Sequence, residues 1–243
     1  MNEIDQTLVQ LTRTPLRTID DVIGVFSAIG NTVPESDGLH WFNWLYLTVT
    51  KSVGDSVAAV HWHNPAWLAR LDVVFAGLYL TGIRRCLTGD TEAPRCWQAL
   101  MQARHDTRLA RIQFAMAGMN AHINHDLPVA VVETCREMGL KPEHNSPVYQ
   151  DYSQVNRLLD GLIDAAEATL MVRLLGEAIP AVDAVEDRLA GFGIATSREL
   201  AWTNAELLWR VRRMPPLSRR FTAGLDQTAG LVGRGLLVPV LPG

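Results

Sequence analysis

The spacing of apolar residues constrains the fold of this 243-residue chain more than any other feature. Through most of the sequence these residues recur every three to four positions, as they do on the buried face of an α-helix. Alternating strand patterns bounded by Asn-Gly or Asp-Gly turns are scarce. The pattern therefore predicts an all-α fold, a helical bundle of about eight to ten helices.

Capping residues and helix breakers predict where the helices begin and end. The expected helices cover residues 18–32, 40–60, 64–87, 97–104, 149–176, 180–191 and 197–214. Another helix is expected before Pro128, which disfavours the α conformation at Leu127 and should break that helix there. A new helix should follow, with Gly139 as its stop.

The length and composition of the chain favour one domain. At 243 residues and 48% hydrophobic content, the chain can bury one large core. We expect a single all-α domain over residues 1–243. Within it, residues 230–243 intersperse Gly, Val and Pro, which predicts an irregular tail.

Charge and cysteine usage exclude several classes of partner. A net charge of −4 provides no broad basic surface, so nucleic acid is not expected as a partner. Cys86, Cys96 and Cys135 are odd in number and lack C-x-x-C spacing, which indicates neither a disulfide framework nor a thiolate metal site. No secretory leader is evident, and no apolar run approaches the ~18–20 residues of a membrane span. We expect a cytoplasmic protein and leave a homodimer open.

A dense polar segment lies in an otherwise apolar stretch between residues 118 and 128. If it is helical, its two histidines and its aspartate share one arc, and its two asparagines share the opposite arc. These residues are His122, His125 and Asp126 on one side, and Asn120 and Asn124 on the other. Such a concentration of polar side chains predicts a functional site, in which the segment lines a pocket and braces a neighbouring helix.

Asp72 is the most informative single residue outside this segment. Apolar residues at helical spacing surround it and predict that its side chain is buried. A buried carboxylate needs a partner or must be protonated, and Arg104 and His122 are the candidate partners. A structural Asp–Arg brace between helices and a catalytic carboxylate are equally compatible with the pattern.

His122, His125 and Asp126 could also bind one divalent metal ion, because their spacing brings the side chains together on a helix. The doublet of His125 and Asp126 resembles that of metal-dependent phosphohydrolases. That resemblance implies a first ligand at His61 or His63 and a last one at Asp151 or Asp160. The alternative is that Asp126 caps the next helix.

The aromatic-rich part of the chain predicts a pocket for a small molecule. Most of its seven tryptophans are explained by the core alone. Small-molecule pockets nevertheless combine an apolar lining with a few oriented polar groups. On that basis we predict that Asn43, Tyr46, Tyr79 and Asn124 bind a small, largely apolar substrate.

Several motifs together resemble a bacterial family, best known from actinobacteria, that is catalogued only as a domain of unknown function. The matching residues are Asp37-Gly38, 46–53, Arg70-Leu-Asp72, Phe75-Ala76, Tyr79, Trp97, Arg104, Gln113-Phe-Ala, 118–124 and 126–128. The resemblance covers most of residues 18–160 and implies a one-domain, all-α cytoplasmic protein. It supplies no reaction, and in its pattern the position of His125 is not a fixed histidine.

Our functional hypothesis is an enzyme that catalyses cyclisation, isomerisation, elimination or hydrolysis by proton transfer. In it His122 moves a proton, Asp72 orients it, Asp126 lies beside it, and Asn120 or Arg104 stabilises negative charge. One alternative is a metal-dependent hydrolase that uses the two histidines and Asp126. Another is a non-catalytic binding or scaffold protein, whose polar cluster only joins helices.

Overall fold

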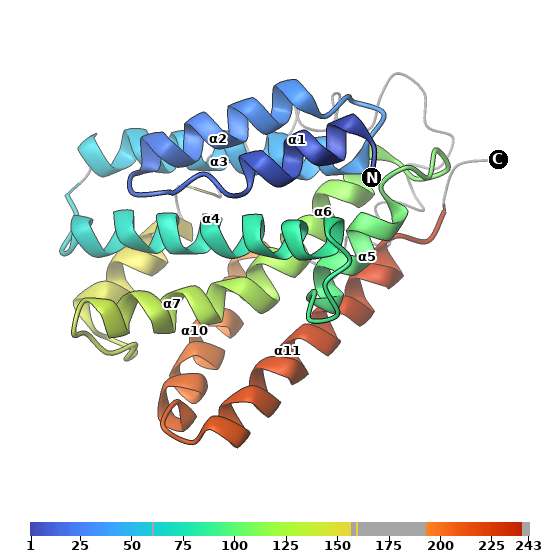
Figure 1. Cartoon of the computed structure of the whole chain (residues 1–243). Helices are drawn as coiled ribbons and strands as arrows, with labels where there is room; N and C mark the ends of the chain where they lie inside the picture. The colour runs from blue at the N-terminus through green and yellow to red at the C-terminus, as the bar shows by residue number, and fades with distance from the viewer. Residues whose placement is uncertain (60, 157–158, 160–192, 240–243) are drawn as a thin grey trace.

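A computed structural model describes residues 1–59, 61–156, 159 and 193–239 (Figure 1). The described residues form helices without a strand, which confirms the all-α prediction. The α-helices are α1 (Glu3–Leu11), α2 (Ile19–Thr32), α3 (Gly38–Ala59), α4 (Pro65–Leu87), α5 (Arg95–Ala103), α6 (Arg111–Ala121), α7 (Leu127–Glu137), α10 (Ile194–Val211) and α11 (Pro215–Leu236). A π-helix, η1 (His122–Asp126), joins α6 to α7, and residues 147–156 are also helical.

Helix α4 lies at the centre of the bundle. Figure 1 shows α1, α2 and α3 along one side of it and α7, α10 and α11 along the other. Its side chains Trp67 and Tyr79 are fully buried. Because α4 packs against α7, α5, α2, α3 and α1, it positions most of the other elements.

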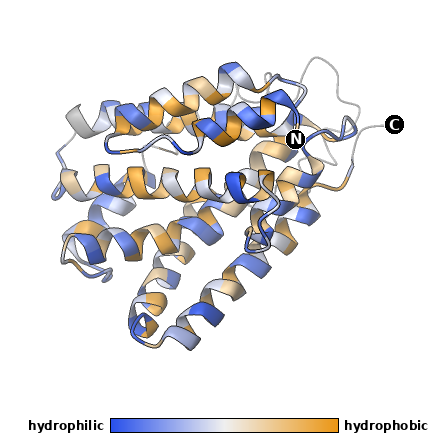
Figure 2. Ribbon diagram, viewed as in Figure 1, coloured by the Kyte–Doolittle hydropathy of each residue, from blue (hydrophilic) through white to orange (hydrophobic). Residues whose placement is uncertain are grey.

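The expectation that no segment is long and apolar enough to cross a membrane needs a correction for α4. By length and composition alone, its 23 residues pass that test. Figure 2 shows hydrophobic residues along this helix, and 56% of its most apolar window is buried inside the bundle. This burial explains the apolar composition of α4, because a helix in the core of a bundle is hydrophobic on most of its surface.

Capping explains where two predicted helices begin. Thr18 and Asp21 form a capping box at the start of α2. At the start of α4 the Asn64 side chain accepts the backbone N–H of Trp67 at 3.0 Å, and Pro65 occupies the first turn. The sequence analysis missed α1, which is capped by Asn2.

The predicted break before Pro128 is wrong. Leu127 has φ −62° and ψ −44°, which is helical, and its N–H bonds to the carbonyl of His122, five residues earlier. A proline has no N–H, and its ring clashes with the carbonyl four residues back in a regular helix. The wider π turn accommodates the ring, so α6, η1 and α7 follow one another without a break. Gly139, with φ +68°, lies just beyond α7 as predicted.

The irregular tail predicted for residues 230–243 is wrong for residues 230–236, which belong to α11. Two of its glycines, Gly230 and Gly233, serve close packing instead of breaking the helix. A Cβ added to Gly230 would lie 3.1 Å from the backbone of Arg95, and one added to Gly233 would lie 3.4 Å from Ala99. The helix predicted over 180–191 lies outside the described residues, as does most of the one predicted over 149–176.

Candidate functional site

The polar segment places His122 and Asp126 together in the core. His122 is 1% exposed and Asp126 2% exposed. The Nδ1 atom of His122 lies 3.0 Å from Asp126 Oδ2, which also accepts the indole N–H of Trp97 at 3.0 Å. The predicted proximity of this histidine and aspartate is confirmed.

Both members of this pair have shifted pKa values. Burial lowers the pKa of His122, although the hydrogen bond to Asp126 acts in the opposite direction. Burial alone would raise the pKa of Asp126, but hydrogen bonds from His122 and His125 outweigh it and lower the pKa. The pair is therefore a neutral imidazole that donates Nδ1–H to a carboxylate. The Nε2 atom of His122 has no hydrogen-bond partner among the described residues.

Aromatic rings enclose His122. The Phe75 ring stacks on the imidazole at a centroid distance of 3.4 Å and an interplanar angle of 6°. The Tyr46 ring lies 4.4 Å away, and Phe42 and Trp97 complete the enclosure at 5.8 and 6.1 Å. The contacts of the imidazole are therefore a hydrogen bond with Asp126 and packing against these aromatic rings.

Asp126 does not cap α7. Its carboxylate makes no capping hydrogen bond to the backbone of that helix. Instead, Oδ1 lies 2.7 Å from Nδ1 of His125, while Oδ2 bonds to His122 and Trp97. Three side chains from two separate parts of the chain thus meet at one carboxylate.

Asp72 lies at a small cavity and pairs with neither predicted partner. The cavity has a volume of about 50 Å³, and Asp72, Tyr46, Phe75 and Arg198 line it together with apolar side chains. The Oδ2 atom of Asp72 is buried and has no hydrogen-bond partner among the described residues. Burial raises the pKa of Asp72 to about 7.

Tyr46 and Arg198 are the other polar groups of this cavity. The buried hydroxyl of Tyr46 has no hydrogen-bond partner within the described part of the chain. Burial raises the pKa of Tyr46 well above its usual value, and the negative charge of Asp72 adds to this effect. Arg198 is held in place by Asn156 Oδ1 at 2.5 Å and by the ring of Tyr152 at 4.4 Å.

The sequence analysis missed Arg198, although a signal for it exists. The buried residues of α10 are Arg198, Ala201, Trp202, Ala205 and Leu208. Their spacing of three and four residues is that of a buried helix face, and the arginine stands at its first position. A cation within an apolar stripe could therefore have been selected by the same criterion that selected Asp72.

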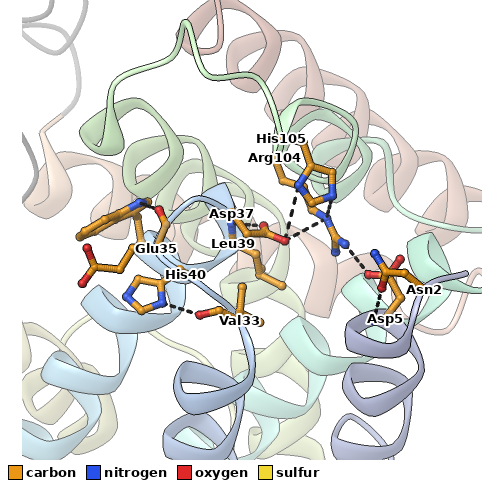
Figure 3. Close-up of polar contacts among 10 residues, drawn as sticks. Asn2, Asp5, Val33, Glu35, Asp37, Leu39, His40, Arg104 and His105 are labelled. Carbon is orange, nitrogen blue, oxygen red and sulfur yellow. Dashed lines mark hydrogen bonds and ion pairs between the residues drawn. The ribbon is translucent and has the colours of Figure 1, made fainter.

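Arg104 lies in a different cluster, so its predicted pairing with Asp72 is wrong. Figure 3 shows its guanidinium between Asp37 and Asp5. Its Nε lies 3.3 Å from Asp37, and its backbone carbonyl accepts the N–H of Gly38 at 2.6 Å. Arg104 joins the end of α5 to α1 and to the start of α3. The predicted Asp–Arg brace between helices exists, but with other aspartates.

The two asparagines of the polar segment face away from His122. Asn120 donates to the backbone carbonyl of Ala229 in α11 at 2.7 Å, and its Oδ1 accepts Asn124 at 3.0 Å. Both line a separate groove of about 590 Å³ beside α10 and α11. Asn120 therefore holds α11 in place, which does not match its predicted role next to His122.

Asn43 and Tyr79, predicted to bind substrate, lie in the core behind the cavity. Asn43 donates to the Phe26 carbonyl at 2.9 Å, and the Tyr79 hydroxyl lies 3.5 Å from Asn43. Both are fully buried and neither lines the cavity. Of the residues predicted to bind substrate, Tyr46 lines this cavity.

The predicted metal ligands are not arranged around one point. Asp126 lies between His122 and His125 and contacts each with a different oxygen. Two of the predicted phosphohydrolase ligands do meet, because Asp151 accepts hydrogen bonds from His63 Nδ1 at 3.1 Å and from the N–H of Asn64 at 2.6 Å. Among the described residues, however, neither of them forms a group of three potential metal ligands with His125 or Asp126. Asp151 thus fixes the start of α4, whereas Asp160 lies outside the described residues.

The comparison with protein families gives a match over residues 19–239, to a family described as "Family of unknown function (DUF5995)". The chain belongs to DUF5995. This result confirms the predicted membership of a family known only as a domain of unknown function. No curated protein and no solved structure matches the chain. The function of this DUF5995 chain must therefore be argued from its own site.

Proposed function

We propose that the protein is an enzyme that transfers protons on a small, largely apolar molecule, with Asp72 as the acid or base. The observation that carries this proposal is the buried, unpaired Oδ2 of Asp72 at an apolar cavity that also holds Tyr46 and Arg198. Apolar walls with a few convergent polar groups are typical of small-molecule sites. A carboxyl group whose pKa is near neutrality suits general acid–base catalysis at physiological pH.

Arg198 takes the role that the sequence analysis gave to Arg104. Arg198 is a cationic side chain and lines the same cavity as Asp72. Negative charge that develops on a carbonyl oxygen, as in isomerisation, elimination or cyclisation, would be stabilised by such a cation. The hydroxyl of Tyr46 is a second donor for that oxygen.

His122 enters the same proposal through Phe75. The Phe75 ring both lines the cavity and stacks on the imidazole, so it separates His122 from the cavity. Rotation of this half-buried ring enlarges the cavity and gives His122 Nε2 access to a bound molecule. The imidazole, oriented by Asp126, is then a second proton-transfer group.

A non-catalytic scaffold is the competing function, and the volume of the cavity favours it. About 50 Å³ holds one or two water molecules, at ~30 Å³ each, and not a whole metabolite. In a scaffold protein, the contacts of Asp126 with His122, His125 and Trp97 would only join helices. In both cases the net charge of −4 supports a protein that does not bind nucleic acid, and the odd number of cysteines without C-x-x-C spacing supports a cytoplasmic one.

Hydrogen–deuterium exchange at carbon distinguishes the two functions. Wild-type protein in D₂O is incubated with a panel of small apolar ketones, esters and enones, and deuterium incorporation is measured by mass spectrometry. The proposal predicts incorporation that Asp72→Asn slows by ~10²-fold or more and that the exposed control Asp55→Asn leaves unchanged. Equal incorporation with wild type and Asp72→Asn, including none with either, would favour the scaffold.

A further inference from the structure

Three potential metal ligands from separate helices converge at the far side of Asp126. They are Cys96 in α5, His125 in η1 and Asp226 in α11. One ligand atom of each lies within 4.8 Å of the other two. Among the described residues, no other group of three histidine, cysteine or acidic side chains meets this criterion.

Neighbouring groups orient two of these side chains. Nδ1 of His125 lies 2.7 Å from Asp126, which is a carboxylate and therefore accepts the Nδ1 proton. In the neutral imidazole this leaves Nε2 as the nitrogen with a free lone pair, in the carboxylate–histidine arrangement that accompanies most metal-bound histidines. The carboxylate of Asp226 accepts the backbone N–H groups of Arg95 and Cys96, each at 3.0 Å.

Helix capping explains only part of this arrangement. The two backbone bonds make Asp226 a cap for the start of α5, where no side chain of that helix supplies one. A cap requires neither the Cys96 thiol nor the His125 imidazole beside it. Their convergence on the same carboxylate is the additional observation, and metal binding accounts for it.

We propose that Cys96, His125 and Asp226 bind a single zinc ion. A thiolate, an imidazole and a carboxylate are the ligands that Zn²⁺ takes in proteins, whereas Mg²⁺ and Ca²⁺ take oxygen ligands. With three protein ligands, a tetrahedral ion keeps one position for a solvent molecule. Cys96 is buried, while His125 and Asp226 are half-buried, so the ion enters from their side.

Binding exchanges one proton for the metal. Burial raises the pKa of the Cys96 thiol well above its usual value, as do the charges of Asp126 and Asp226. When Zn²⁺ binds, the sulfur–zinc bond replaces the S–H bond and the proton leaves to solvent.

This site uses none of the cavity residues Asp72, Tyr46 and Arg198, and the proton transfer proposed there needs no metal. The two proposals share Asp126, which orients both His122 and His125. The zinc site also differs from the metal site predicted from the sequence, which combined His125 with His122 and Asp126. The resemblance described in the sequence analysis implies no fixed histidine at position 125, so the site is proposed as a property of this chain.

Cobalt substitution tests the proposal directly. Co²⁺ is titrated into the metal-free, tag-free protein, because a bound thiolate then produces a sulfur-to-cobalt charge-transfer absorption in the near ultraviolet. The expected result is about one equivalent of Co²⁺ with this absorption, and its displacement by Zn²⁺. Cys96→Ser should abolish the absorption, and the matched control Cys135→Ser, at a buried cysteine in α7, should keep it.

His125→Gln is the second variant, because the half-buried imidazole can be replaced without opening the core. It should weaken Co²⁺ binding by about tenfold or more. The proposal is overturned if wild type gives no charge-transfer absorption, or if the absorption persists in Cys96→Ser. If Cys96→Ser does not fold, unchanged Co²⁺ affinity in His125→Gln overturns it equally.

Discussion

At Asp72 an ionisable group lies against apolar walls, and its protonation changes within the pH range of most cells. Its pKa is about 7 in the folded protein and close to 3.9 in an unfolded chain. Below pH 4 the carboxyl group is protonated in both states and does not affect stability. Between pH 4 and 7 the unfolded chain releases the proton first, so the protein loses stability as the pH rises.

Asp72→Asn should remove this loss, because an amide stays neutral at every pH. We expect the variant and wild type to have similar unfolding free energies near pH 4. By pH 8 the variant should be more stable by about 2–4 kcal/mol, following the pKa difference. Urea unfolding at a series of pH values measures the difference. A constant difference across this range would contradict the burial of Asp72 Oδ2 without a hydrogen-bond partner.

His122 stabilises the core through its ring and through Asp126. His122→Ala removes a ring that stacks on Phe75 and leaves a buried carboxylate without one of its donors. The expected loss of stability is about 2–4 kcal/mol. The control His61→Ala, at an exposed histidine, should change stability by about 0.5 kcal/mol or less. A loss below 1 kcal/mol for His122→Ala would mean that its contacts contribute little.

At the scale of the helix, two glycines of α4 provide a matched test of close packing. A Cβ at Gly82 would lie 2.4 Å from the Trp97 ring, whereas nothing lies within 4 Å of a Cβ at Gly77. Gly82→Ala should therefore destabilise the protein by about 1–3 kcal/mol. Gly77→Ala should stabilise it by about 0.5–1 kcal/mol, because alanine is the better helix former.

Thermal unfolding of Gly82→Ala and Gly77→Ala measures these two changes in stability. A similar effect of the two substitutions would show that α5 does not approach α4 as closely as the contact between Gly82 and Trp97 requires.

The starts of α2 and α4 were predictable from local signals, whereas the course of the helices past prolines and glycines depended on packing. The caps Thr18 and Asn64 act within four residues, so the sequence contains the whole interaction. Pro128 and Gly230 carry breaker signals that tertiary structure overrides, through a π turn in one case and close packing on α5 in the other. No local pattern reports which neighbour a glycine or proline will meet.

At the scale of the whole molecule, a buried ionic cluster joins the N-terminal helix to the rest of the bundle. Arg104 contacts Asp5 of α1 and Asp37 before α3. Arg104→Met leaves the carboxylate of Asp37, which is 2% exposed, without its cation. The expected loss of stability is about 3–5 kcal/mol.

A double variant separates the two sources of this loss of stability, which are the broken ion pair and the lost packing of the arginine side chain. If the cost comes from the uncompensated carboxylate, Arg104→Met combined with Asp37→Asn should recover at least about 1 kcal/mol relative to Arg104→Met. Urea unfolding of the three variants and wild type gives this coupling energy. Strictly additive losses would contradict the ionic account.

The sequence did not predict which residues the charged side chains of the site contact. Helical spacing correctly indicated that His122 and Asp126 lie together, because four residues separate them along the chain. Arg104 and Asp72 were both expected in the core, but α5 directs Arg104 toward the N-terminal helix. Arg198 and Asp226 come from α10 and α11, more than 100 residues after Asp72, and only the packed bundle brings them near the predicted residues.

The pKa of Asp72 tests the central claim most directly. Protein labelled with ¹³C in its aspartate carboxyl groups is titrated by NMR, and Asp72→Asn identifies the signal. The account predicts a midpoint near pH 7, as expected for a buried carboxyl group at the cavity. A midpoint near pH 4 would contradict it, because Asp72 would then be a solvated or paired carboxylate and not the acid or base of a proton-transfer site.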